Sequence, residues 1–510
     1  MKKVFLYSFA LVLAFVMSIG QVAAQELVLP VEIPELNPKI MEVATKAVPD
    51  LLERPDKATN QITKAIKLAK NDKGQLMALA MWFTQQENGM QAAKYVIDKV
   101  YETNASDIDV MLVAGDIYGT MGLWGRAGQK YDQVLEIDTA NIYALTQGAR
   151  IYKNHNADAS LAMWERLLQL EPNNTLAMRN IGDLVFDKNY LAEAVKYYGQ
   201  YYDNVPHTKA TLNAASMEKY LIALFYTEGQ DARLMKVGSE LYEVDPNDLA
   251  YQRFAFYGTI VNYDSVPATL ERLKRYASYV TENRVADSLL IANDYRYAYQ
   301  LSALSGDYGK CVGYLTRAVD APRDAVEVGM LKNAAFNLSA EGQNEVAAEM
   351  YQAYNDRAGE TLTTEDMLMV VVLYRQALYT SQDAAQKAAL KDKALSLIEQ
   401  IEPKFDDASK YQLMLERAHI VAGVNGENSV EAIQAYEKAL ESCKNYEAAG
   451  ESVKNVAIKL MLYYVNALQT AEDEEATWAK IRKYCDIVLN IEPFNETALD
   501  INEVLIQFGK

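Results

Sequence analysis

The sequence of 510 residues has few of the residues that carry catalysis or hold metal ions. None of its 3 His (His155, His207 and His419) has a second His or Cys at the spacing of a metal site. It contains no GxSxG nucleophile elbow, no glycine-rich phosphate loop and no HExxH motif. Acidic pairs such as Asp406 and Asp407 are typical of solvated loops. The sequence therefore predicts a protein that is not an enzyme and that binds no metal or cofactor.

Cysteine is also scarce, with Cys311, Cys443 and Cys485 as the whole set. A set of this size allows a single disulfide, so bridges do not hold a chain of this length together. We expect Cys311 and Cys485 to be buried thiols, because both lie at helix positions that favour a small apolar residue. A bridge between Cys443 and Cys485 is the alternative.

Basic residues are outnumbered, since 50 Lys and Arg stand against 69 Asp and Glu and the formal charge is −19. A chain this acidic repels phosphate backbones, which excludes nucleic acid as an expected partner. An acidic surface is also how a long soluble scaffold stays in solution. Tyrosine, by contrast, is abundant, with 35 Tyr against 12 Phe. Tyrosine suits half-buried positions, where the ring is apolar and the hydroxyl is polar.

Long hydrophobic runs are confined to the beginning of the chain. Lys2 and Lys3 precede an apolar run from Val4 to Ile19, and small residues allow cleavage after Ala24. This pattern predicts a secretory signal peptide at residues 1–24. A retained membrane anchor is the alternative, although the run is short for a span. No Cys follows it, as a bacterial lipoprotein would require. We expect a protein exported to the periplasm or cell envelope of a bacterium, without a transmembrane segment after cleavage.

Proline is rare except in residues 25–55, which carry 5 of the 12 Pro. This density favours an extended leader, with a short helix near residues 40–47. The leader is expected to be a tether, or a strap that runs along the first helices. A recognition segment for another exported protein is the alternative.

Three sets of positions repeat at intervals of 34, 33 and 34 residues. The sets are Ala93, Ala127, Ser160 and Ala194; Ile97, Tyr131, Trp164 and Tyr198; and Met81, Gly115, Gly148 and Gly182. A stack of helical hairpins explains such a period, because each hairpin must present the same knobs and hollows to the next. Small residues let two helices cross closely, and the bulky residue fills the hollow between hairpins.

Prolines mark the boundaries between successive hairpins. Pro172, Pro206 and Pro493 each follow a predicted helix, which a proline does not continue. Asn174 and Asn495 come next and are expected to cap the following helix.

These residues resemble the tetratricopeptide repeat (TPR) family, a solenoid of 34-residue helix-turn-helix units. Gly182, Ala194, Tyr198 and Pro206 match the family pattern in one unit, and Ala432 and Tyr436 match it later in the chain. The resemblance implies an all-α fold, an α-α superhelix of antiparallel helix pairs. The predicted parts are a Pro-rich leader at 25–55, an N-terminal array at 56–250, an irregular helical connection at 251–290 and a C-terminal array at 291–510.

The resemblance also implies where a partner binds, since the first helix of each pair lines the concave face in this family. From their positions within the repeat, the residues predicted to face a partner are Trp82, Gln85, Leu112, Asp116, Tyr152, Arg179, Asn180, Asp183 and Phe186. Some members that dock chaperones hold a peptide's terminal carboxylate in a basic, Asn-rich clamp. Only Arg179 and Asn180 approach that pattern, so the clamp is not carried over.

The predicted groove is aromatic and acidic, which favours an extended polypeptide with apolar and basic side chains. The first hypothesis is accordingly a non-catalytic exported scaffold that binds another protein or a peptide. The second is a periplasmic or surface protein that binds a nutrient or glycan, with Tyr and Trp stacking on sugar rings.

Overall fold

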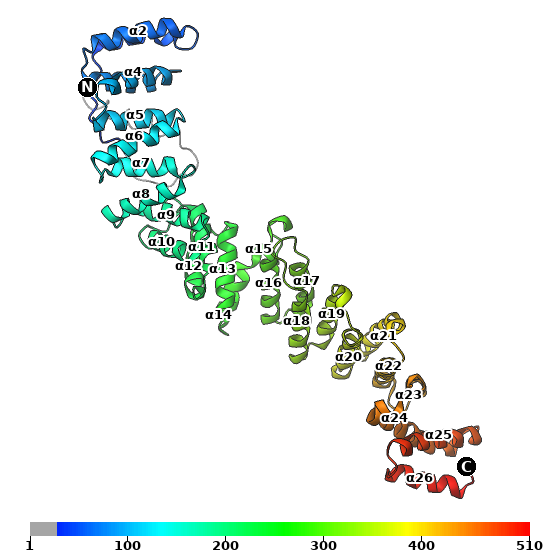
Figure 1. Cartoon of the computed structure of the whole chain (residues 1–510). Helices are drawn as coiled ribbons and strands as arrows, with labels where there is room; N and C mark the ends of the chain where they lie inside the picture. The colour runs from blue at the N-terminus through cyan, green and yellow to red at the C-terminus, as the bar shows by residue number, and fades with distance from the viewer. Residues whose placement is uncertain (1–27) are drawn as a thin grey trace. The chain divides into compact units, whose positions relative to one another are not determined.

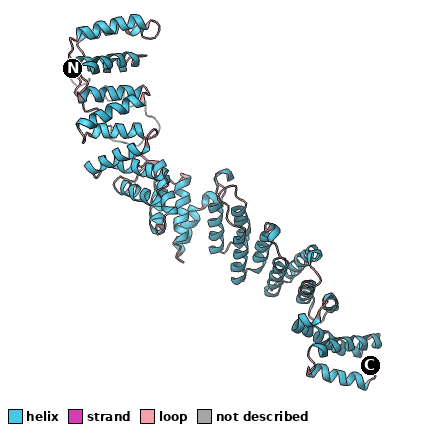
Figure 2. Cartoon of the chain, viewed as in Figure 1, coloured by secondary structure: helices cyan, strands magenta, loops and turns pink. Residues whose placement is uncertain are grey.

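The computed structural model describes residues 28–510, and the predicted signal peptide with its cleavage site lies outside the described residues. Throughout the described range the chain is helical, without a β-strand (Figures 1 and 2). None of these helices is both long enough and apolar enough to cross a membrane. Contacts divide the chain into an N-terminal unit (Met1–Tyr276) and a C-terminal unit (Ala277–Lys510).

In the N-terminal unit the helices stack in the order of the sequence, from blue to green in Figure 1. They are α1 (Pro38–Thr45), α2 (Pro55–Leu68), α3 (Lys73–Thr84), α4 (Met90–Thr103), α5 (Ile108–Thr120), α6 (Trp124–Ile137), α7 (Ile142–Tyr152), α8 (Ala157–Leu170), α9 (Thr175–Asp187), α10 (Leu191–Asp203), α11 (Ala214–Tyr226), α12 (Asp231–Val244), α13 (Leu249–Val261) and α14 (Pro267–Tyr276). The helices α3 to α10 pack as consecutive antiparallel pairs.

The C-terminal unit continues the same architecture with longer helices toward its end. Its helices are α15 (Ser278–Thr281), α16 (Ala292–Leu304), α17 (Cys311–Val319), α18 (Gly329–Ala340), α19 (Asn344–Asn355), α20 (Thr364–Thr380), α21 (Ala384–Ile401), α22 (Lys410–Asn425), α23 (Val430–Ser442), α24 (Tyr446–Ala467), α25 (Glu474–Ile491) and α26 (Glu496–Gln507). Short 3₁₀ turns occur at Val48–Asp50, Asp287–Leu289, Tyr308–Lys310, Gly359–Thr361, Glu402–Lys404 and Leu468–Thr470.

Side-chain caps begin many of these helices. The Asn174 side chain accepts a hydrogen bond from the Ala177 amide at the start of α9, and Asn495 does the same at α26. The prolines expected among the repeat-packing residues, Pro172, Pro206 and Pro493, are exposed. They follow the ends of α8, α10 and α25 and so act as helix terminators, not as packing residues.

The turns inside the hairpins keep the period of the sequence. Asn88, Gly122 and Asn189 have positive φ angles of 57°, 72° and 63°. Glycine and asparagine are the residues that adopt this left-handed conformation most readily, so the turn restricts the residue type at that position.

The repeated glycines provide the close helix crossings. A Cβ atom on Gly115 would lie 2.8 Å from the Tyr131 ring, and one on Gly182 would lie 2.7 Å from the Tyr198 ring. Ala127 and Ala194 are 0% exposed beside these crossings. The Tyr ring of the second helix therefore occupies the space that a side chain on the first helix would fill.

Other repeat positions vary this packing. A Cβ atom on Gly148 would lie 2.8 Å from the Met163 sulfur, while Trp164 fills the core at 1% exposure. In the C-terminal unit Ala432 and Tyr436 are buried at 0% and 2% exposure. The small and the bulky positions of the repeat are therefore core positions in both units.

The predicted irregular connection at residues 251–290 contains both regular and short elements. Its first part belongs to α13, a continuous helix that packs more extensively on α12 than α11 does. The rest holds α14, the short helix α15 and the 3₁₀ turn at Asp287–Leu289. A Cβ atom on Gly238 would lie 2.8 Å from the Phe254 carbonyl oxygen, and one on Gly258 would lie 2.7 Å from the Met235 Cα atom. The tightest crossing here joins α12 to α13, so the glycines no longer follow the 34-residue spacing.

The proline-rich segment is fixed on the first helices. The Asn37 amide donates to Gln75 Oε1 at 2.7 Å, and Gln75 Nε2 donates to the Glu35 carbonyl at 3.0 Å. A Cβ atom on Gly74 would lie 3.1 Å from Pro34. The helix α1 lies within this segment and packs on α2, so residues 38–45 form part of the first helix pair.

The cysteines are free thiols within residues 28–510. Cys311 and Cys485 are buried at 0% exposure, as expected from their helix positions, and Cys443 is half-buried. Burial raises the pKa of Cys311 to about 11, which keeps it a neutral thiol at physiological pH.

We expect Gly182→Ala to destabilise the N-terminal unit by about 1–3 kcal/mol, because the new methyl group overlaps the Tyr198 ring. Gly125→Ala in α6 is the matched control, since a Cβ atom there meets nothing within 4 Å. Alanine favours a helix over glycine, so the control variant should be as stable as the parent or more so. Urea denaturation followed by tryptophan fluorescence measures both. Equal midpoints for Gly182→Ala and the parent chain would contradict the close-crossing interpretation.

Candidate functional site

Asp116 on α5 is the centre of a buried polar network. Tyr131 of α6 and Tyr143 of α7 each donate a hydrogen bond to its carboxylate at 2.6 Å. The same Tyr131 ring covers the neighbouring Gly115. One glycine, one carboxylate and two tyrosines thus join a helix to its own partner and to the next pair, and Asp116 is only 8% exposed.

Asp183 on α9 repeats this arrangement. Tyr198 of α10 covers Gly182 and donates to Asp183 Oδ1 at 2.8 Å. Ser216 of α11 donates to the same oxygen at 2.9 Å, and Lys153 lies 3.6 Å from the other oxygen. Both predicted acidic groove residues therefore already hold hydrogen-bond donors from neighbouring helices.

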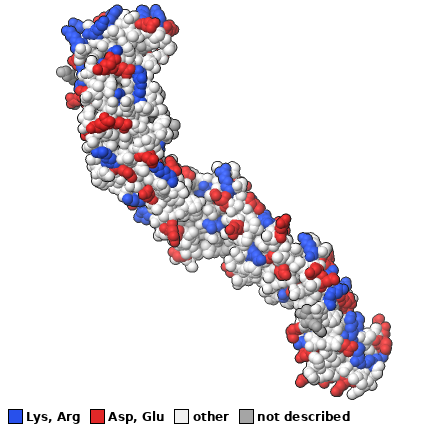
Figure 3. Space-filling model, viewed as in Figure 1, with Lys and Arg blue, Asp and Glu red and all other residues white. Residues whose placement is uncertain are grey.

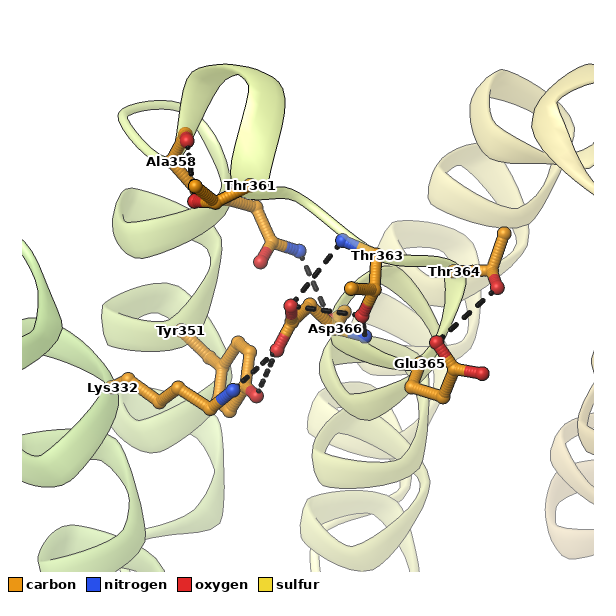
Figure 4. Close-up of polar contacts among 9 residues, drawn as sticks. Lys332, Tyr351, Ala358, Thr361, Thr363, Thr364, Glu365 and Asp366 are labelled. Carbon is orange, nitrogen blue, oxygen red and sulfur yellow. Dashed lines mark hydrogen bonds and ion pairs between the residues drawn. The ribbon is translucent and has the colours of Figure 1, made fainter.

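The C-terminal unit has a carboxylate of the same kind at Asp366 on α20 (Figure 4). Lys332 Nζ lies 2.6 Å from its Oδ1 atom, and Tyr351 donates to that oxygen at 2.7 Å. The Thr363 hydroxyl donates to Oδ2 at 2.9 Å. A capping box also begins α20, since the Thr363 amide donates to Asp366 Oδ2 at 3.3 Å and the Asp366 amide donates to Thr363 Oγ1 at 3.1 Å. Tyrosine hydroxyls bound to carboxylates thus recur in both units and account for part of the high tyrosine content.

Trp164 shows what happens where the carboxylate is missing. Its position in the period matches Tyr131 and Tyr198, but the residue after Gly148 is Ala149. Its buried indole Nε1 has no hydrogen-bond partner among the described residues. The tryptophan fills the volume of the tyrosine without its polar link, and at this crossing the Ser160 hydroxyl of α8 donates a hydrogen bond to the Ala149 carbonyl of α7 at 2.7 Å instead.

The pKa values of Asp116 and Asp366 are shifted in opposite directions. Burial raises the pKa of Asp116 to about 6, although hydrogen bonds from Tyr131 and Tyr143 oppose the shift. Burial acts against Asp366 too, but hydrogen bonds from Lys332, Tyr351 and Thr363 outweigh it and lower the pKa to about 2. The difference has two causes: burial removes Asp116 from water more completely, and Asp366 is bonded to the Lys332 cation and to Thr363, whereas Asp116 has no cationic partner within residues 28–510.

Most of the predicted binding residues remain on the exposed side of the first helices, but several do not. Leu112 is buried at 1% exposure and belongs to the core. Asn180 is 8% exposed and donates its side-chain amide to the Leu176 carbonyl at 2.8 Å. Together with Asp116, these residues are part of the fold and not of an open groove. This outcome follows from helix crossing angles, which a residue spacing does not specify.

The predicted residues that are still accessible are Trp82 of α3, Gln85 directly after α3, and Arg179, Asp183 and Phe186 of α9. Gln85 is exposed and the other four are partly exposed. Lys219 of α11 lies 5.4 Å from the centre of the Phe186 ring, and it also pairs with Asp187 at 2.6 Å. We call the surface formed by Trp82, Gln85, Arg150, Arg179 and Phe186 the first-helix face.

Arg150 of α7 was not among the predicted binding residues, and the structure places it near enough to Arg179 for the two charges to interact. Burial and then the charge of Arg179 lower the pKa of Arg150. Its closest hydrogen-bond contact is Gln147 Oε1, at 3.5 Å from Nη1. Within residues 28–510 neither arginine forms an ion pair. Arg150 and Arg179 are 29 residues apart in the sequence. Because this interval differs from the 34-residue period, the repeat did not indicate that the two side chains are neighbours.

Tyr152 lies apart from the first-helix face. Its hydroxyl donates to Asp132 Oδ2 of α6 at 2.5 Å, and the ring lines a pocket of about 620 Å³ at the turns of two hairpins. Trp124, Arg126 and His155 share this pocket, and Trp124 is 44% exposed. The Trp124 and His155 rings are 6.5 Å apart. The pocket is therefore an exposed aromatic site at the edge of the stack.

The remaining histidines have structural surroundings. His207 stacks on Tyr202 with ring centres 3.9 Å apart. His419 is partly buried, and burial lowers its pKa. Among the described residues no group of three or more His, Cys, Asp or Glu is arranged to hold a metal ion.

The helix pairs, their glycine crossings and their left-handed turns define an all-α solenoid of the tetratricopeptide repeat type. Comparison of the sequence with models of protein families gives no match, and comparison with curated proteins gives none either. Comparison with solved structures finds repeat proteins of this type. The class follows from the helix packing within the chain itself.

Three of these structures illustrate the range. YrrB, described as a TPR protein with an unusual peptide-binding site, is 18% identical over 37% of this chain and 95% of its own, with a TM-score of 0.32. PilF of Pseudomonas aeruginosa is 17% identical over 42% of this chain and 98% of its own, with a TM-score of 0.30. The C-terminal part of a TPR repeat-containing protein from Cytophaga hutchinsonii is 15% identical over 63% and 98%, with a TM-score of 0.26.

We expect the free energy of unfolding of the N-terminal unit to fall as the pH rises from 4 to 7, because Asp116 loses its proton over this range. Its folded pKa of about 6 exceeds the ordinary value of 3.8, so the folded state holds this proton more tightly than the unfolded state. Relative to Asp116→Asn, the parent chain should lose stability over this range, by an amount on the order of 3 kcal/mol at most. Urea titrations at both pH values, followed by tryptophan fluorescence, measure the difference.

Asp366→Asn is the control with the opposite sign. Its folded pKa of about 2 lies below the ordinary value, so its stabilising effect is complete above pH 4 and is lost as the pH falls toward 2. The assignment of a buried, proton-binding carboxyl would be contradicted if the difference in free energy of unfolding between the parent chain and Asp116→Asn did not change between pH 4 and 7.

Proposed function

We propose that this protein is an exported, non-catalytic scaffold that holds an extended segment of another protein on the first-helix face of its N-terminal unit. The observation that carries the proposal is the pair Arg150 and Arg179. Two neighbouring guanidinium groups, one of them largely desolvated, lie on adjacent first helices without a carboxylate partner among the described residues. Such an arrangement costs free energy that a bound anion offsets.

The pair also changes the expected chemistry of the partner. The sequence suggested an acidic groove, but the Asp116 and Asp183 carboxylates already accept hydrogen bonds from tyrosines. The free charges that remain are positive, and guanidinium groups bind carboxylates in bidentate fashion. We therefore infer a partner segment that carries Asp or Glu beside apolar residues, with the latter contacting Trp82 and Phe186.

The exported location rests on the sequence of residues 1–24, and a bacterial periplasm or envelope is the proposed compartment. The test is to express the whole chain in a bacterium, fractionate the cells and determine the N-terminus of the recovered protein. Export with cleavage predicts a chain that begins at Gln25. A cytoplasmic chain that keeps Lys2 and Lys3 would overturn this part of the proposal.

Arg150→Ala with Arg179→Ala should weaken peptide binding by about 10- to 100-fold, as expected when charge-assisted hydrogen bonds worth about 1.5–3 kcal/mol are lost. The probe is an array of extended peptides in which acidic, basic and apolar positions are varied systematically. Arg166→Ala on α8 is the matched control, because this exposed arginine belongs to a second helix. Preference for basic peptides, or equal binding by the double variant and the control, would refute the assignment.

A second candidate function has its own observation in the pocket of Trp124, Tyr152 and His155. Exposed aromatic rings around a cavity of about 620 Å³ suit stacking on sugar rings, which favours a nutrient- or glycan-binding protein. A thermal-shift screen against oligosaccharides tests it. A ligand-dependent rise in melting temperature that disappears in Trp124→Ala supports glycan binding at this pocket.

A further inference from the structure

The first helix pair leaves a basic groove open at one end of the N-terminal unit. The groove has a volume of about 580 Å³ and is lined by Val43, Lys46, Gln61, Lys64, Lys67 and Leu68 of α1 and α2. Leu68 is 47% exposed on its rim. Figure 3 shows blue side chains gathered over this end of the unit, which is unusual in a chain with a formal charge of −19.

The lysines of this groove are only partly neutralised. Lys46 pairs with Glu42 at 3.0 Å, in an exposed contact that contributes little. Lys64 and Lys67 lie three residues apart on α2 and have no carboxylate partner within residues 28–510. The groove thus combines the apolar side chains of Val43 and Leu68 with two unpaired positive charges.

The last helix has the complementary character. The helix α26 packs on α25 through Ala498 and Leu505, both 0% exposed. Leu499 and Ile506 are exposed at 39% and 65% on one flank of the helix, and Val504 is exposed at 41% on the other flank.

Carboxylates lie among these apolar residues of α26. Glu496, Asp500 and Glu503 are exposed at spacings of four and three residues, so they follow one side of the helix. None of them forms an ion pair among the described residues. This outer side of α26 is therefore an acidic and apolar surface.

An exposed apolar face on a helical repeat favours the stacking of another helix on it. The α1–α2 groove and the outer side of α26 both expose apolar residues, and their unpaired charges have opposite signs. Like ends repel each other, whereas unlike ends attract and bury apolar surface on both sides. The surfaces lie in different units, and each is complete within its own unit.

We propose that the outer side of α26 of one copy docks in the α1–α2 groove of a second copy. The contact is head to tail, so repeated docking makes a chain or a closed ring of copies. Each contact is small and ionic, and its strength falls as salt screens the charges. This self-association is independent of peptide binding at Arg150 and Arg179.

Sedimentation velocity of the full chain over a range of concentrations and salt tests the proposal. We expect concentration-dependent association at low ionic strength that is lost at high ionic strength. Lys64→Glu with Lys67→Glu should abolish it, and so should Asp500→Lys with Glu503→Lys. A parent chain that stays monomeric at low salt overturns the proposal.

Charge restoration separates docking from a loss of folding. The chain that carries all four changes again has opposite charges at its two ends, and we expect it to recover association. Lys236→Glu with Lys438→Glu is the control for net charge, since both lysines are exposed outside the two surfaces. Association of this control should match that of the parent chain. Failure of the four-fold variant to recover association, with its helical signal intact, overturns head-to-tail docking.

Discussion

The contact between a tyrosine ring and a glycine on the facing helix is the constraint on which the rest of the structure depends. Gly115 and Gly182 let the helices approach until Tyr131 and Tyr198 cover them. At that distance each tyrosine hydroxyl reaches the carboxylate next to the glycine, Asp116 or Asp183. Close packing and a buried hydrogen bond therefore come from one geometry, and they set the spacing and direction of successive pairs.

This geometry also decides which charges face outward. A carboxylate that accepts bonds from two tyrosines, as Asp116 does, is removed from the surface available to a partner. The arginines at 150 and 179 have no such internal partner among the described residues, so they give the first-helix face its positive character. Lys64 and Lys67 on α2 and the carboxylates on α26 likewise have no internal ion-pair partner among the described residues, so their charges also face outward. Recognition in this protein thus begins from what internal packing leaves unsatisfied.

Sequence reasoning succeeded where it depended on residue size and failed where it depended on side-chain direction. Trp164 and Tyr436 were correctly placed in the core, because a large residue that recurs at a fixed interval indicates a packing position. Leu112 and Asp116 were placed in the groove, although both are buried, because a rotation of one residue separates the two sides of a helix. Arg150 was missed since its spacing from Arg179 does not follow the repeat.

The sequence by itself determined the helical-repeat class, the hairpin turns and the core residues, because these follow from local propensities and from a period in residue size. Only the tertiary structure decided the polar partners, because a hydrogen bond between Tyr143 and Asp116 joins residues 27 positions apart in adjacent pairs. It also decided that the closest crossing near residue 250 joins α12 to α13. Crossing angles depend on all the side chains at an interface, and a period in the sequence does not contain them.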